Sequence, residues 1–418
     1  MPVKEFNHRI TTLSNGLRVV TEQMPTLSSV SVGMWIRCGS VLESEAENGL
    51  SHFIEHMLFK STENRSTREI AEEMDRLGGQ MNAFTSKECT CYYAKVITEH
   101  LPRALTLLFD ILTHPRLDPG EMEKERGVIL EEIAMSEDTP DDLVFDLLSE
   151  AWYNDHPMAR PILGYESFIS GVSREQLRAF REKHYFPANT VLAVVGSFDE
   201  EALLEQCERE LGDWPARGVA EEPLPFVPSA PRVIYRTKEI EQVHIAQAWP
   251  GVAQSDLRIY PVSVLCNLLG GGNASRLFMK IREEMGAAYS VYCYPSAQMG
   301  SGTVNLYAAT SPENAQRVSH ALHEERQRLL REGISREEFD MSKEQLKVSY
   351  ILGMEGSSAR MNVLGRNLLL RNRVIDPSDV LRHMEAVTME DVLDQAHQVF
   401  EGAYAAAAVG RQTDQLLM

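Results

Sequence analysis

The run His52-Phe53-Ile54-Glu55-His56 combines residue types that can hold a metal ion and move a proton. If this segment is helical, successive side chains are rotated by about 100°, so His52, Glu55 and His56 lie on one face. Two imidazoles four residues apart suit a divalent zinc ion, and a glutamate beside them can act as a general base next to the metal. The opposite face is apolar, so the same helix can pack on a core.

The spacing of these residues, H-x-x-E-H, is that of the inverted zinc-peptidase motif. The alternative interpretation is that two histidines share an exposed helix face and bind nothing. The chain has 12 histidines among 418 residues, so few such matches are expected by chance, yet one match is no proof. A catalytic zinc site also needs a third protein ligand, commonly His or Glu.

A third ligand could come from a predicted helix that begins at Asp118-Pro119-Gly120-Glu121. A capping Asp, followed by Pro and by Glu three residues later, is typical of a helix start. Glu125 and Glu132 share a partly apolar face, so a carboxylate there is half-buried and needs a partner. Glu131 points elsewhere, and most glutamates of so acidic a helix are expected to be solvated. Spacing alone therefore leaves both Glu131 and Glu132 open as the third ligand.

Alternating and periodic apolar patterns predict an ordered series of elements around these residues. In the first half, strands are predicted at 16–20 and 30–36, helices at 49–60 and 67–77, a hairpin at 80–97 and a long helical region at 118–151. In the second half, strands are predicted at 243–249, 288–294 and 302–309, and helices at 257–269, 275–284 and 314–332. Both halves therefore follow one order of elements.

Four prolines between Glu221 and Pro231 predict an extended linker, because proline at this density excludes helix. We predict three parts: a zinc-binding catalytic domain over residues 1–220, a Pro-rich linker over 221–231 and a similar second domain over 232–418. Because the halves repeat one order of elements, the fold class is predicted to be α+β, with two similar domains derived from an internal duplication.

The chain carries 41 Lys and Arg against 61 Asp and Glu, which gives a net charge of −20. An acidic surface repels nucleic acid and anionic lipid, so neither is expected as a partner. No apolar run approaches the ~18 residues that a membrane helix needs. The six cysteines are dispersed and are expected to be reduced, half-buried thiols. These features favour the cytoplasm, with the mitochondrial matrix as the alternative if a leader has been removed.

The run Asn48–Lys60 resembles the active helix of the pitrilysin-type zinc peptidases, which include mitochondrial processing peptidase and insulin-degrading enzyme. The chain is similar to the bacterial, processing-peptidase-like branch of that family. This resemblance implies that His52, His56 and Glu132 bind one Zn²⁺ per subunit, and that Glu55 is the general base. It thereby selects Glu132 over its neighbour as the third ligand.

The resemblance extends to other segments and implies further roles. Glu125 would support the site by orienting a ligand histidine. Residues 78–86 resemble the family's edge strand, so the backbone around Asn82, Ala83 and Phe84 would pair with bound peptide. Residues 270–278, and the Arg and Tyr after them, are similar to a segment in the second half of family members. In the family, that segment completes the active site. Tyr289 would then donate a hydrogen bond to the oxyanion, and Arg282 would hold the substrate backbone.

The family pattern also implies an architecture and a reaction. Two similar α/β-roll domains, each an antiparallel-rich sheet flanked by helices, would form half of a clamshell. A chain that carries both the zinc residues and the Arg/Tyr pair would complete itself as a homodimer, with each site finished in trans. The implied function is a zinc-dependent endopeptidase acting on unfolded peptides or presequence-like segments. Two alternatives are a non-catalytic scaffold related to processing peptidase and a peptide-binding protein without turnover.

Overall fold

The computed structural model describes residues 7–216, 222, 226, 231–411, 413 and 416. The chain folds into two compact units, each assembled from three segments. Unit 1 contains Met1–Ile133, Pro161–Pro223 and Ile351–Ser378, and unit 2 contains Ala134–Arg160, Leu224–Tyr350 and Asp379–Met418. Segment 134–160, from the first half of the sequence, therefore belongs to unit 2, and segment 351–378, from the second half, belongs to unit 1. Most of the predicted linker, 221–231, lies outside the described residues, and the boundaries of the three predicted parts stay a prediction.

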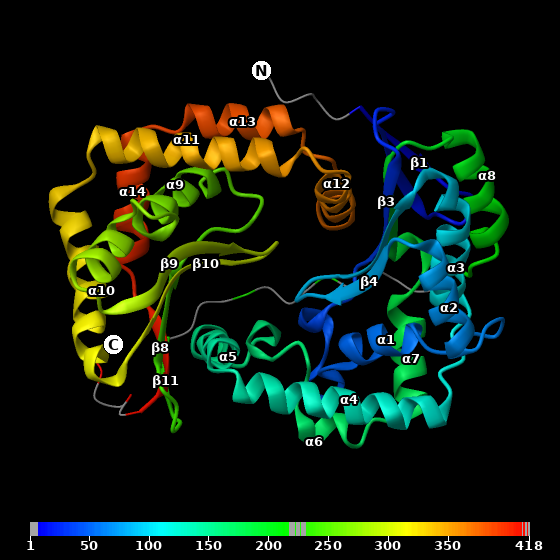
Figure 1. The fold of residues 1–418 in the computed structure, drawn as a ribbon, viewed down its shortest axis with the longest axis horizontal. Helices are drawn as coiled ribbons and strands as arrows, with labels where there is room; N and C mark the ends of the chain where they lie inside the picture. The colour runs from blue at the N-terminus through cyan, green and yellow to red at the C-terminus, as the bar shows by residue number, and fades with distance from the viewer. Residues whose placement is uncertain are drawn as a thin grey trace. The chain divides into compact units, whose positions relative to one another are not determined.

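A six-stranded mixed sheet forms the centre of unit 1 (Figure 1). Its strands are β1 (His8–Thr12), β2 (Arg18–Gln23), β3 (Ser29–Ile36), β4 (Gln80–Thr85), β5 (Thr90–Ile97) and β6 (Thr190–Gly196). Their spatial order is β1-β2-β6-β3-β5-β4; β2 and β6 run parallel, and the other neighbours run antiparallel. This order places β4 at one edge of the sheet, next to β5.

Helices surround the sheet of unit 1, and those on one face enclose an apolar core with it. They are α1 (Leu50–Leu58), α2 (Thr67–Leu77), α3 (Leu101–Thr113), α6 (Glu166–Ile169), α7 (Arg174–His184), α8 (Glu200–Leu211) and α12 (Ser357–Arg371). The helix α4 (Pro119–Asp138) begins in unit 1 and crosses the boundary between the units. The core draws buried side chains from the inner strands and from α1, α3 and α7, so the predicted zinc helix is part of the core packing.

The helix α12 comes from late in the chain but packs on β3 and β6 of the first sheet. Arg360 of α12 forms a buried, bidentate ion pair with Glu22 of β2. Gly365 lies against the indole of Trp35, and a Cβ at this glycine would come within 2.3 Å of the indole Nε1. A side chain at position 365 would therefore displace α12 from the sheet.

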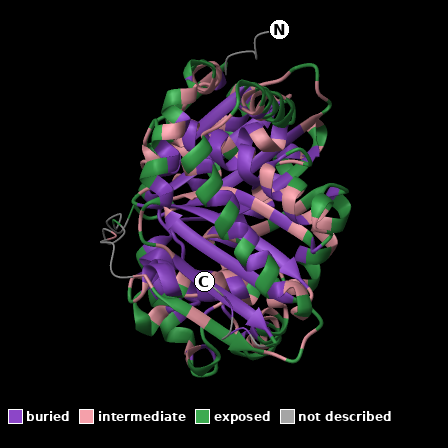
Figure 2. Cartoon of the chain, turned by 90° about the vertical axis from the view of Figure 1, so that its left-hand side faces the viewer, coloured by how far each residue is buried: buried purple, intermediate pink, exposed green. Residues whose placement is uncertain are grey.

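Unit 2 is built on a five-stranded sheet with the order β7-β11-β8-β10-β9. Its strands are β7 (Val233–Thr237), β8 (Val243–Pro250), β9 (Ala288–Ala297), β10 (Gly302–Thr310) and β11 (Ala405–Gly410). Its helices are α5 (Pro140–Tyr153), α9 (Ile259–Gly270), α10 (Pro312–Glu332), α14 (Met389–Phe400) and the π-helix η6 (Phe278–Glu284), while α11 (Arg336–Gly353) and α13 (Pro377–Ala386) reach the unit's boundary. Figure 2 shows strands that are mostly buried, in agreement with a core centred on the sheet.

The two sheets repeat one connectivity, which confirms the predicted α+β class with two similar domains. Each sheet has one parallel pair, β2 with β6 and β7 with β11, followed by three antiparallel strands, β3-β5-β4 and β8-β10-β9. The strand β1 is an addition in unit 1. The repeat extends to the helices, because α12 packs on β3 and β6 whereas α5 packs on the corresponding strands β8 and β11.

Local details differ from the sequence-based expectation in three places. The helical region predicted for 118–151 is two helices, because α4 ends at Asp138 and α5 begins at Pro140, whose ring disfavours helical backbone in the preceding residue. The helix predicted for 275–284 is largely a π-helix, η6. The six cysteines are buried rather than half-buried, and four of them lie in the two apolar cores. No described helix has both the length and the apolar character needed to cross a membrane.

Candidate metal centre

The predicted zinc helix α1 is anchored at its start by a buried carboxylate. Glu43 accepts hydrogen bonds from the backbone N–H groups of Gly49 and Ser51, both at 2.8 Å, and from the Asn48 side chain at 3.1 Å. A negative charge at this position also suits the positive end of the helix dipole. Gly49 has φ of 96°, and a Cβ there would lie 2.8 Å from the Leu163 carbonyl oxygen, so glycine is required. Sequence patterns gave no indication of Glu43, because two of its hydrogen bonds come from backbone N–H groups.

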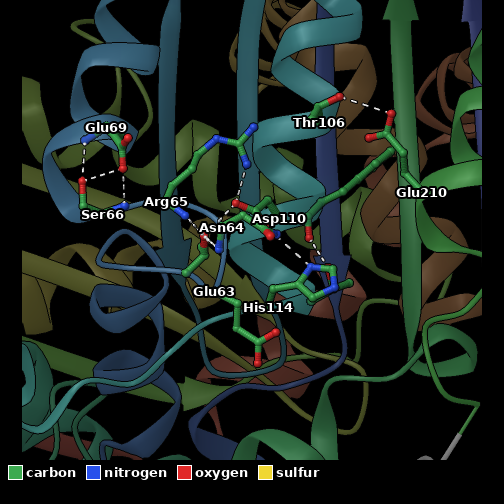
Figure 3. Close-up of polar contacts among 12 residues, drawn as sticks. Glu63, Asn64, Arg65, Ser66, Glu69, Thr106, Asp110, His114 and Glu210 are labelled. Atoms are coloured by element: carbon green, nitrogen blue, oxygen red, sulfur yellow. Dashed lines mark hydrogen bonds and ion pairs between the residues drawn. The ribbon is translucent and has the colours of Figure 1, made fainter.

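A second anchor holds the segment that follows α1 (Figure 3). The carboxylate of Asp110, buried near the end of α3, accepts hydrogen bonds from Thr62 at 2.8 Å, Asn64 at 2.6 Å and Arg65 at 2.5 Å. The Nδ1 atom of His114 lies 3.6 Å from the same carboxylate. This network ties α3 to the connection between α1 and α2, so both ends of α1 are fixed to the rest of unit 1.

The structure brings His52, His56 and Glu132 together in unit 1. Glu132 Oε2 lies 3.7 Å from His52 Nε2 and 3.5 Å from His56 Nε2. The three ligand atoms lie within 4.8 Å of one another, and this is the one group of its kind found among the described residues. Glu131 is exposed, whereas Glu132 points to the histidines from α4. The geometry thus separates two glutamates that helical spacing alone left open.

The donor set and its spacing fit a zinc ion. Ligands bound at about 2.0–2.1 Å in a tetrahedron lie about 3.3–3.5 Å from one another, close to the separations from Glu132. Two imidazole nitrogens and one carboxylate leave a fourth position for water or substrate, as catalytic zinc requires. The side chain of Glu132 is 33% exposed, so the cluster is open to solvent on that side.

Glu125 lies between His56 and Lys60. Its Oε2 lies 3.2 Å from His56 Nδ1, and its Oε1 lies 2.7 Å from Lys60 Nζ. With Nδ1 donating to Glu125, the lone pair of His56 Nε2 is directed toward Glu132. Glu125 is buried, so Lys60 also supplies the counter-charge that a buried carboxylate needs. Lys60 follows His56 by four residues, and this spacing could have indicated that both side chains lie on the same side of the chain.

His52 is held in its neutral form. Burial, and then the neighbouring His56, lower the pKa of His52 to about 3. Its Nδ1 atom is buried without a hydrogen-bond partner among the described residues. A neutral imidazole whose Nε2 faces a carboxylate and a second imidazole offers its lone pair to a cation over the physiological pH range.

Glu55 lies on α1 between the two histidines. Among the described residues, its carboxylate forms no ion pair. Its Oε2 accepts a hydrogen bond of 2.5 Å from the Thr85 hydroxyl. Burial raises the pKa of Glu55, and nearby Glu132 adds to this rise, while Thr85 and His56 oppose it. A carboxylate with a raised pKa next to a metal site suits proton transfer near neutral pH.

The residues predicted to bind substrate lie on the exposed edge strand β4. Asn82 and Phe84 are exposed, while Ala83 between them is half-buried against the core. The ring of Phe84 packs edge-on against Trp35, with centroids 5.7 Å apart, on the face of the sheet that α12 covers. The opposite face of β4 carries Ala83 and Thr85 and meets α1. This edge strand thus adjoins the helix that carries His52, Glu55 and His56.

Arg282 and Tyr289 lie in unit 2, and the structure brings them to each other. The Arg282 guanidinium carbon lies 4.7 Å from the ring centre of Phe278 and 4.9 Å from that of Tyr289. Tyr289 is strongly exposed, at 75%. Arg282, which is half-buried on η6, and the exposed Tyr289 on β9 therefore form one pair, in a different compact unit from His52, His56 and Glu132.

Comparison with known proteins identifies the family. A family model described as insulinase, peptidase family M16, matches residues 18–166, and a second, described as the peptidase M16 inactive domain, matches residues 171–346. The first match contains the metal cluster and Glu55. The second contains Arg282 and Tyr289.

Several curated proteins are similar over nearly their whole length. An uncharacterized zinc protease of Bacillus subtilis, YmxG, is 41% identical over 95% of this chain and 97% of its own. An uncharacterized zinc protease of Mycobacterium tuberculosis is 38% identical over 98% of this chain and 94% of its own. One of Rickettsia felis is 33% identical over 97% of this chain and 98% of its own.

Two solved structures share the fold. The crystal structure of a protease from Helicobacter pylori has a TM-score of 0.88 and 21% identity, covering 97% of this chain and 99% of that one. A peptidase M16 inactive domain from Pseudomonas fluorescens has a TM-score of 0.87 and 19% identity, covering 97% of this chain and 98% of that one. Since relatives at 33–41% identity span almost all of it, the chain belongs to peptidase family M16, the insulinase family of peptidases.

Proposed function

We propose that this chain is a zinc-dependent endopeptidase that hydrolyses unfolded peptides or presequence-like segments. The observation that carries the proposal is the convergence of His52, His56 and Glu132 on one point, with Glu55 on the same helix as the two histidines. The names of the curated relatives, zinc proteases in each case, support the choice of metal and of reaction.

The residues divide the work of hydrolysis among them. When bound, zinc would acidify a water molecule and polarise the scissile carbonyl. Glu55 accepts the proton of the attacking water and later passes it to the leaving amine nitrogen. Glu125 and Lys60 keep His56 in the orientation in which Nε2 faces the cluster. In the proposed mechanism, Tyr289 donates a hydrogen bond to the oxyanion and Arg282 holds the substrate backbone.

Substrate is proposed to bind in extended form as an added strand next to β4, within an enclosed chamber. The edge position of β4 supports this, since its outer N–H and C=O groups are available to a peptide around Asn82, Ala83 and Phe84. Binding of this kind requires an extended chain, so folded proteins are excluded as substrates. The net charge of −20 favours basic peptides, and we propose the cytoplasm as the compartment.

Cleavage of an internally quenched, basic, unfolded peptide tests this function. The zinc-loaded chain is expected to cleave the peptide, to stop when a chelator removes the metal, and to recover when Zn²⁺ is restored. A tightly folded basic domain of similar charge is the control and should stay intact. A metal-loaded chain that binds the peptide without cleaving it would instead be a peptide-binding protein, and one that binds neither metal nor peptide would be a scaffold.

We further propose that the chain is a homodimer in which each metal site is completed by the partner's Arg282 and Tyr289. The exposure of the Tyr289 side chain and its place in the other compact unit support this arrangement. Mixing the variants Glu55→Gln and Tyr289→Phe, each inactive alone, should restore activity once subunits exchange. Each mixed dimer then holds one site with both an intact Glu55 and an intact Tyr289.

The control is the same mixture before exchange, which should stay inactive. If activity does not return although mass spectrometry of differently tagged subunits proves exchange, then the site is completed within one subunit. A Tyr289→Phe variant that is active alone would show that Tyr289 has no role in the site.

A further inference from the structure

One hydrogen bond joins the proposed general base to the edge strand. Thr85, the last residue of β4, donates its hydroxyl proton to Glu55 Oε2 over 2.5 Å, the short end of the range for a hydroxyl and a carboxylate. Among the residues that the structure describes, no other group donates a hydrogen bond to this carboxylate. The orientation of Glu55 therefore depends on one side chain.

The neighbouring hydroxyl group does not compete for this bond. Thr90 lies directly opposite Thr85 in the β4–β5 pair, with the two hydroxyl oxygens 3.3 Å apart. The Thr90 hydroxyl donates a hydrogen bond to the carbonyl oxygen of Cys38 over 2.8 Å, because a carbonyl oxygen can only accept. The single proton of Thr85 is thus available to Glu55.

The Thr85 hydroxyl is held in a fixed place. The turn after β4 is closed by the Ser86 backbone and side chain, which donate to the Cys89 carbonyl oxygen at 2.9 Å and 2.7 Å. A hydrogen bond of 2.8 Å from the Val41 N–H to the Lys87 carbonyl oxygen holds this turn against the connection between β3 and α1. Because threonine is branched at Cβ, its χ1 angle has few alternatives on a strand of this kind.

From these contacts we infer that Thr85 is a positioning residue for catalysis, which fixes the Glu55 carboxylate through its hydroxyl group. The inference rests on the proposed function, in which Glu55 is the general base and β4 pairs with the substrate. The terminal torsion of a glutamate is broad and nearly two-fold, so a carboxylate without this donor has several orientations available. The strand β4 would then align both the substrate and the general base, so the position of Glu55 relative to the scissile bond would be fixed.

Two substitutions at position 85 separate the hydroxyl from the shape of the side chain. Thr85→Val keeps the branched shape and removes the donor, and is expected to lower kcat by about 10- to 100-fold, the effect of losing a hydrogen bond to a charged group. KM for the quenched peptide and the zinc content should stay within about twofold of wild type, since neither backbone pairing nor a ligand changes. Thr85→Ser keeps the donor and should restore most of kcat.

Thr90→Val is the matched control, because it removes the adjacent hydroxyl without touching Glu55. It should reduce stability, since the Cys38 carbonyl loses its donor, but it should leave kcat within about twofold of wild type. Crystal structures of the zinc-loaded wild type and Thr85→Val give a readout that is independent of turnover. Glu55 should have one carboxylate orientation in the wild type and a displaced or divided one in the variant.

The inference is overturned if Thr85→Val keeps wild-type kcat, if its loss lies in KM, if Thr85→Ser fails to restore activity, or if Thr90→Val loses as much. It is equally overturned if the Glu55 carboxylate keeps its place in the structure of Thr85→Val. A wild-type chain that cleaves no peptide contradicts the proposed function instead, and the two structures still decide whether Thr85 positions Glu55.

Discussion

Replacing Glu55 by glutamine is expected to lower peptide turnover by about 10²–10⁴-fold or more while the zinc content stays at the wild-type level. The amide keeps the size of the side chain and can still accept a hydrogen bond from Thr85, but it cannot take the proton of the attacking water. Turnover of the quenched peptide and metal analysis of the same sample give the two readouts.

A companion variant shows whether the loss belongs to Glu55 itself. Glu131→Gln makes the same chemical change at an exposed glutamate of α4 and should leave turnover unchanged. Glu55→Gln with wild-type turnover would remove Glu55 from the mechanism. If the prediction holds, the variant should bind substrate without cleaving it and so serve to trap natural substrates.

Loss of any one metal ligand is the second large effect. His52→Ala, His56→Ala and Glu132→Gln should each lose bound zinc after dialysis against a weak chelator, whereas the wild type should keep close to one ion per chain. Each change removes one of three protein donors, and zinc held by two donors exchanges readily with solvent and chelator. Metal content by atomic emission and peptide turnover should fall together.

The neighbouring glutamates of α4 provide a sharp comparison for this prediction. Glu132 lies within 3.7 Å of both histidines, while Glu131 is exposed one residue away. Glu131→Gln should therefore keep its zinc. The reverse result, with zinc lost from Glu131→Gln and retained by Glu132→Gln, would show that the assignment of the third ligand is wrong.

Much of the local structure followed from the sequence. The helix predicted for 67–77 is α2, with a Ser66 cap and the same bounds, and the hairpin predicted for 80–97 is the pair β4 and β5. These predictions succeed because capping, periodicity and strand propensity act over a few residues. The order of elements also indicated the repeat, which the matching connectivity of the two sheets confirms.

Other features depend on contacts between distant parts of the chain. The helix α12 packs on β3 and β6, and α5 packs on β8 and β11. The sequence of either helix does not indicate which strands it will contact. The sequence prediction ran one helical region through Thr139, although Pro140 was the available signal for the break. The burial of all six cysteines likewise depends on which face each element turns to its core.

The sequence by itself determined that His52, Glu55 and His56 share one face of a helix, because a 3.6-residue period sets their directions without any other part of the chain. It also restricted the third ligand to a short stretch of α4. Helical spacing left Glu131 and Glu132 open, and only the resemblance favoured Glu132 and gave Glu125 a role. The tertiary structure places Glu132 against the histidines, pairs Glu125 with both His56 and Lys60, and brings Thr85 to Glu55. These contacts join residues that are up to 80 positions apart in the chain, from His52 to Glu132, so they depend on how α4 and β4 pack around α1, which no local pattern records.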